Sequence, residues 1–134
     1  MKHLIPVFLF VVALIPFQAG ANSSTPQLLA VTFYADWCGS CKILEPQISK
    51  ARAKADLDNQ DVLFVTLDLT NATTRHQSAL LAAALGMDEF YNENNGKTGF
   101  MLLVNAQSGE TVGKITKESD SGAITAAITE QLGS

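Results

Sequence analysis

The only two cysteines of the 134-residue chain, Cys38 and Cys41, stand in a C-x-x-C spacing. They follow an apolar run, Leu28–Tyr34, and open a stretch with the periodicity of a helix. A helix N-terminus carries unpaired N–H groups and the positive end of the helix dipole, which together stabilise a thiolate placed there. The second thiol lies one turn further along and can close a disulfide on the first. The spacing therefore predicts a dithiol that cycles between reduced and oxidised forms.

The side chains next to the pair suit this chemistry. Trp37 offers a flat apolar surface beside the first sulfur, and Lys42 adds a cation directly after the second. Asp36 and Glu45 are the nearest carboxylates, and either could relay a proton. For Asp36, a solvated surface carboxylate is the favoured interpretation.

Two other interpretations of the C-x-x-C pair stay open. Exported proteins often use two cysteines for a structural disulfide, although the loop closed here is very short. A metal site is the second alternative. A closed zinc site needs four ligands. Beyond the N-terminal apolar stretch, the cysteine and histidine ligands of the chain are Cys38, Cys41 and His76, which is one too few. We therefore predict no metal and no cofactor.

The remaining sequence alternates between strand-like and helix-like segments. Apolar, β-branched runs predict strands, and apolar residues at steps of three and four predict helices. We expect Pro46 to kink the first helix and an asparagine-rich loop to cover Asp88–Lys97. In chain order the expected elements are strand Leu28–Tyr34, helix Cys38–Leu57, strand Val62–Leu69, helix Thr74–Leu85, strands Phe100–Val104 and Thr111–Ile115, and a final helix that starts within 119–122.

This β-α-β-α-β-β-α order restricts the topology. The two β-α-β crossovers favour parallel pairing, and the last two strands form an antiparallel hairpin. The order thus predicts an α/β domain with a mixed sheet.

The segment Trp37-Cys38-Gly39-Ser40-Cys41-Lys42, placed after a strand, resembles the active site of the thioredoxin superfamily. With Tyr34-Ala35-Asp36 before it, Glu45 after it and the segment 67–71 (Leu-Asp-Leu-Thr-Asn), it is most similar to the C-terminal thioredoxin-like domain of the DsbD thiol:disulfide interchange protein and its secreted relatives. The resemblance implies a thioredoxin-like fold with a central mixed four-stranded sheet, helices on both faces and a truncated N-terminal β-α unit.

The resemblance also implies roles for the site residues. Cys38 corresponds to the nucleophile and Cys41 to the resolving thiol. Gly39 and Ser40 would set the turn and tune the redox potential, and common thioredoxins carry proline where Ser40 stands.

Two departures from the family pattern stand out. Thioredoxins bury an aspartate in the strand before the site, and Thr32 occupies that position here. They also carry a cis-proline opposite the cysteines, where this chain has Gly99 after Thr98. Thr98 and Gly99 would therefore border the substrate groove without a proline, and Glu45 or water would have to deprotonate Cys41.

The N-terminus has the pattern of a signal peptide. Met1-Lys2-His3 is a short basic segment, Leu4–Ile15 is apolar, and Ala19-Gly20-Ala21 fits a cleavage site. We therefore predict a signal peptide over residues 1–21 and a domain over 22–134, exported to the periplasm or secreted. An uncleaved N-terminal membrane anchor is the alternative.

Together these features predict an exported thiol–disulfide oxidoreductase that acts as a reductase or electron relay. Its partners would be oxidised protein disulfides and a membrane electron donor, and the protein would be a monomer. The formal net charge is −4 with no basic patch, so no nucleic-acid partner is expected. The alternative is a non-enzymatic thioredoxin-fold binding module with a structural or metal-binding C-x-x-C pair.

Overall fold

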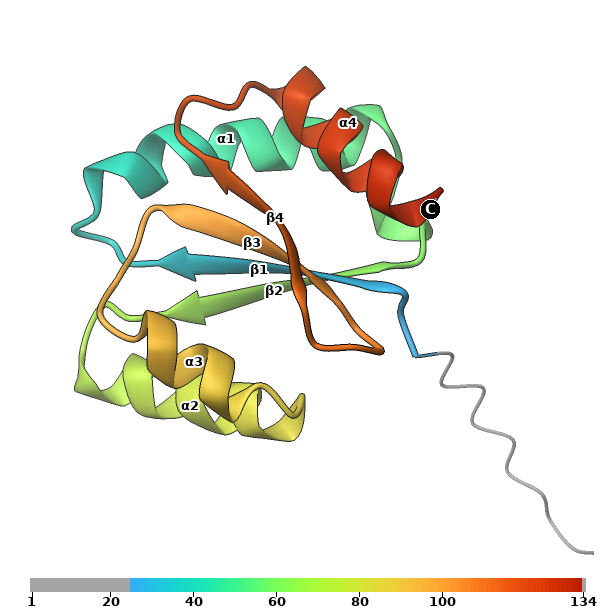
Figure 1. Ribbon diagram of the computed structural model, residues 1–134. Coiled ribbons are helices and arrows are strands. Elements are labelled where there is room, and N and C mark those ends of the chain that lie inside the picture. Colours follow the sequence, from blue (N-terminus) through green and yellow to red (C-terminus); the bar gives the residue numbers. More distant parts are fainter. Residues whose placement is uncertain (1–24, 134) are drawn as a thin grey trace, which may run out of the picture.

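Four strands form one mixed sheet in the order β2-β1-β3-β4 (Figure 1). The computed structural model describes residues 25–133, so the predicted signal peptide lies outside the described residues. β2 runs parallel to β1, and the pairs β1–β3 and β3–β4 are antiparallel. The predicted α/β fold with a four-stranded mixed sheet is confirmed. The strands are β1 (Leu28–Tyr34), β2 (Val62–Asp68), β3 (Phe100–Asn105) and β4 (Thr111–Thr116).

Helices cover both faces of this sheet (Figure 1). α1 (Gly39–Lys54) and α4 (Ser121–Leu132) pack on one face, and α2 (Ala72–Ala84) and α3 (Asp88–Asn94) pack on the other. Among the described residues, no helix combines the length and the apolar character needed to span a bilayer.

The central strand β1 divides the core into two layers. Its side chains alternate, so that Ala30 joins the apolar cluster beneath α1 and α4, while Val31 and Phe33 join the cluster beneath α2 and α3. All three are fully buried. The continuous apolar run of β1 thus reflects a strand that is covered on both faces.

The predicted loop over Asp88–Lys97 is wrong in its first part, because residues 88–94 form α3. Two aromatic residues anchor this short helix. Phe90 packs on Phe33 with 5.8 Å between the ring centroids, and the buried Tyr91 donates a hydrogen bond from Oη to the Arg75 carbonyl at 3.1 Å. Tertiary packing therefore holds a segment whose asparagines and acids favour a loop.

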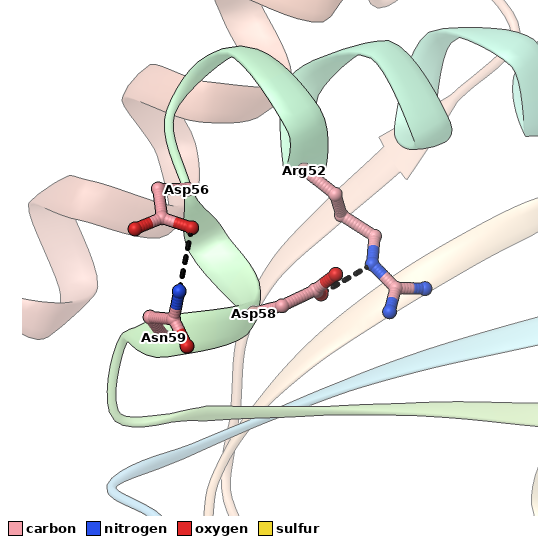
Figure 2. A network of polar contacts seen from close by, with 4 residues as sticks. All are labelled: Arg52, Asp56, Asp58 and Asn59. Atoms are coloured by element: carbon pink, nitrogen blue, oxygen red, sulfur yellow. Dashed lines mark hydrogen bonds and ion pairs between the residues drawn. The ribbon is translucent and has the colours of Figure 1, made fainter.

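α1 continues through Pro46 but ends at Lys54, three residues before the predicted end. Asp56 adopts a left-handed conformation (φ 50°), which breaks the helix and allows Leu57 to enter the core. Figure 2 shows the polar contacts around this end: Asn59 donates to Asp56 at 2.8 Å, and Arg52 Nε lies 2.7 Å from Asp58 Oδ1. Since the ion pair is solvent-exposed, the turn depends mainly on the buried Leu57.

Candidate active site

The C-x-x-C pair lies where β1 passes into α1, at one end of the sheet (Figure 1). Cys38 and Cys41 are joined by a disulfide, with 5.3 Å between their Cα atoms. Cys38 is the N-cap residue of α1, and its sulfur accepts a hydrogen bond from the Cys41 N–H at 3.2 Å. The predicted position of the first sulfur at a helix N-terminus is therefore confirmed.

The two sulfurs sit in different surroundings. Cys38 is 7% exposed and Cys41 is 2% exposed. The Cys41 sulfur lies 3.8 Å from the Phe33 carbonyl oxygen, to which a reduced Cys41 thiol could donate. Cys38 is thus the residue that a disulfide in another protein can approach more easily.

The side chains expected to flank the pair are mostly exposed to solvent. Trp37 is 57% exposed, which fits a platform beside the sulfur and excludes a core role. Asp36, Lys42 and Glu45 are also exposed, and Gly39 and Ser40 form the first turn of α1.

Gly99 lies against the disulfide, as the register of β3 predicts. Its N–H donates to the Phe33 carbonyl at 2.9 Å, a bond that proline could not make. Its backbone has φ +89°, and a Cβ there would lie 2.7 Å from Ser40 Cβ and 3.3 Å from Cys38 Sγ. The half-buried Thr98 precedes it. Glycine is therefore required here by both conformation and space.

A small pocket reaches Cys41 from the sheet edge. Its volume is about 90 Å³, which is enough to hold water. Among its lining residues are Thr32, Cys41, Glu45 and Thr66. Thr32, which stands in place of the family's aspartate, thus shares this pocket with a carboxylate from α1.

Tyr34 links the pocket to the surface acids. Partial burial raises the pKa of its hydroxyl, and the carboxylates of Glu45, Asp36 and Asp68 raise the pKa further. Tyr34 also packs against the small cluster formed by Ala35, Cys38 and Cys41. Its hydroxyl therefore stays protonated at neutral pH and remains available as a hydrogen-bond donor.

This shift predicts a loss of stability at alkaline pH. Because the folded state raises the pKa of Tyr34, the stability that its neutral form contributes is present below the unfolded pKa of about 10 and is lost as pH rises through the folded value. Urea unfolding on either side of that pH should show a smaller alkaline loss for Tyr34→Phe than for the wild type. An identical pH dependence of the two proteins would contradict the assignment.

One residue of the site was missed by the sequence analysis. Thr70, just after β2, accepts from the Asp36 N–H on Oγ1 at 3.0 Å and from Trp37 Nε1 on its carbonyl at 3.1 Å. The sequence feature that could have revealed Thr70 was the predicted parallel pairing of the first two strands. β2 runs parallel to β1, so polar residues that follow either strand meet at the same edge of the sheet.

Comparison with known proteins agrees with this geometry. The family model described as Thioredoxin matches residues 16–129. The chain belongs to the thioredoxin family. It is 43% identical over 42 residues to rabbit (Oryctolagus cuniculus) protein disulfide-isomerase, which covers 31% of this chain and 8% of the isomerase. It is also 43% identical over 52 residues to Arabidopsis thaliana thioredoxin H8, which covers 39% of this chain and 32% of that protein. The chain thus spans less than two fifths of these relatives.

A solved structure shows the same fold. The thiol:disulfide interchange protein of the thioredoxin family from Chlorobium tepidum superposes with a TM-score of 0.56 at 16% identity, covering 81% of this chain and 82% of that one. Membership of the thioredoxin family and the Cys38–Cys41 disulfide are the two observations that bear on the activity of this chain.

Proposed function

We propose that this member of the thioredoxin family is an exported thiol–disulfide oxidoreductase that reduces protein disulfides. The observation that carries the proposal is the Cys38 sulfur at the N-cap of α1, where the Cys41 N–H and the helix dipole stabilise a thiolate. The buried partner sulfur lies within bonding reach of it. A redox-active dithiol needs both features.

The reaction consists of two exchange steps. The Cys38 thiolate attacks one sulfur of a substrate disulfide, which forms a mixed disulfide and releases the other substrate sulfur as a thiolate. The Cys41 thiolate then attacks Cys38 Sγ and releases the second substrate sulfur. The substrate gains two electrons and two protons, and the protein keeps the Cys38–Cys41 disulfide.

The branch of the family and the cellular location are proposed from the residues around the cysteine pair and from the apolar N-terminal stretch. We place the chain nearest to the C-terminal domain of DsbD on the strength of Glu45 and the segment 67–71, and we expect a membrane protein to return electrons to the oxidised pair. The apolar N-terminal stretch supports export to the periplasm or secretion, with the mature protein acting as a monomer. N-terminal sequencing of protein recovered from the cell envelope tests cleavage after Ala21.

The decisive measurement is insulin reduction together with the reduction potential. We expect turnover with dithiothreitol as electron donor. If turnover is absent and the potential lies well below about −300 mV, the C-x-x-C pair is a structural disulfide and the binding-module alternative replaces this proposal.

We further propose that Glu45 accepts the Cys41 proton in the second step. Thr32 cannot act as a carboxylate base at neutral pH, and Glu45 is the acid that lines the same pocket as Cys41. The pocket that both residues line has room for water, which could carry a proton from one to the other.

Substitution of Glu45 and Thr32 tests this assignment. Glu45→Gln should slow the resolution of the mixed disulfide, by up to about a hundredfold if proton removal limits the rate. Thr32→Asp should accelerate insulin reduction at neutral pH and lower the free energy of unfolding, since it places a charge in a half-buried position.

Glu130→Gln is the matched control, because Glu130 is exposed on α4 and lines no part of the pocket around Cys41. Stopped-flow measurement of single turnovers separates the two exchange steps. A wild-type second step in Glu45→Gln would assign the proton to water alone.

A further inference from the structure

Thr70 connects the segment after β2 to the residues that precede Cys38. Its side-chain oxygen accepts from the Asp36 backbone N–H at 3.0 Å, and its carbonyl accepts from the Trp37 indole N–H at 3.1 Å. A residue more than thirty positions along the chain thus holds both residues at the centre of the turn before the nucleophile.

Thr70 is itself held in place from two sides. Its N–H donates to Asp68 Oδ1 at 2.8 Å, and the neighbouring Leu69 N–H donates to the Tyr34 carbonyl at 2.8 Å. On its other side, Asn71 caps α2 through a reciprocal capping box. Thr70 is therefore fixed to the end of β1 and to the start of α2, and can act as a rigid support.

The turn that Thr70 supports sets the position of Cys38. The Cys38 N–H donates to the Ala35 carbonyl at 3.2 Å, which closes a turn with Asp36 and Trp37 at its centre. Trp37 is 57% exposed, so packing alone does not fix its ring. The bond from its indole N–H to Thr70 is the polar contact that orients the ring beside the sulfur.

We propose that Thr70 is a positioning residue that holds the Trp37 ring and the Cys38 turn in the geometry that a substrate disulfide docks on. This inference rests on the proposed function. Without the Thr70 hydroxyl, the Asp36 N–H donates to water instead, and the backbone turn before Cys38 becomes more mobile. Docking then has to order the turn and the ring, which weakens substrate binding.

The test compares Thr70→Val with Thr70→Ser. Valine removes Oγ1, which accepts from the Asp36 N–H, at similar volume and keeps the carbonyl that accepts from Trp37 Nε1, whereas serine retains both acceptors. Thr73→Val is the matched control, because it makes the same change at an exposed position on α2. Insulin reduction gives kcat and KM. Trp37 is the only tryptophan of the chain, so its fluorescence reports on this ring alone.

In Thr70→Val we expect kcat/KM to fall about two- to tenfold, the range of one ordinary hydrogen bond, mainly through a higher KM. The Trp37 emission anisotropy should fall as well, because the turn that carries Trp37 loses the Asp36 N–H bond to the Thr70 hydroxyl, although the Thr70 carbonyl still accepts from the indole N–H. Thr70→Ser and Thr73→Val should retain wild-type values of both quantities. If valine prevents folding, as judged by circular dichroism, Thr70→Ala removes the same acceptor.

Unchanged anisotropy in Thr70→Val overturns the proposal, even if activity falls, because a loss of activity alone would reflect general destabilisation. Unchanged kcat/KM with lower anisotropy also overturns it, because the ring would then be held without consequence for docking. Failure of the proposed function itself has a different signature: the wild type reduces no disulfide. In that case the anisotropy still decides whether the Thr70 hydroxyl steadies the turn that carries the Trp37 ring.

Discussion

Cys38→Ser should reduce insulin turnover to the uncatalysed rate and should trap no partner, whereas Cys41→Ser should accumulate mixed disulfides. The reason is the order of attack. Cys38 occupies the helix N-cap and is the more exposed residue of the pair, at 7% against 2% for Cys41, which follows one turn later. Without Cys41 the first exchange still occurs, but the mixed disulfide lacks its resolving thiol.

The measurement is non-reducing electrophoresis of tagged variants after acid quenching, followed by mass spectrometry of the trapped proteins. The double variant Cys38→Ser/Cys41→Ser controls for non-covalent binding. Equal trapping by the two single variants would show that the roles of the two cysteines are not distinct.

Gly99→Ala should lower the free energy of unfolding and slow disulfide exchange. A non-glycine residue at φ +89° carries about 1–3 kcal/mol of backbone strain, and the added Cβ would lie 2.7 Å from Ser40 Cβ, which adds an overpacking cost of about 1–3 kcal/mol. Gly99→Pro should be worse, because proline requires a negative φ and removes the N–H that donates to Phe33.

Gly96→Ala separates the two contributions. Gly96 has φ +86°, close to that of Gly99, but nothing lies within 4 Å of a Cβ built there. Urea unfolding should therefore show a smaller loss for Gly96→Ala than for Gly99→Ala, and only Gly99→Ala should alter the rate of exchange. Equal losses of unfolding free energy in the two variants would mean that contact of the added Cβ with Ser40 and Cys38 does not destabilise the protein.

The sequence predicted where Gly99 lies but not what it does there. Counting along β3 places Gly99 opposite the cysteines, and the structure agrees. The sequence suggested only that Thr98 and Gly99 border the substrate groove without the family's proline. The structure shows a backbone that makes its own hydrogen bond and packs so closely on Ser40 that a side chain is excluded.

Local chemistry determined much of the fold. The apolar run of β1 and the helical periodicity after Cys38 depend on neighbours in sequence, so their period and composition were sufficient to place them. The position of Cys38 at a helix start followed from the same local signals. Thr32 could likewise be placed beside the site by counting back along a strand.

The tertiary structure decided the features that depend on contacts between distant segments. α3 forms because Phe90 packs on Phe33 and Tyr91 donates a hydrogen bond to the Arg75 carbonyl. Both partners lie too far away in the sequence for a local pattern to reveal these contacts. Thr70 reaches Asp36 and Trp37 because parallel pairing brings the ends of β1 and β2 to the same edge. Sequence alone thus determined the cysteine pair and the elements that carry it, whereas the supports around the pair arose from long-range packing and hydrogen bonding, which no local pattern encodes.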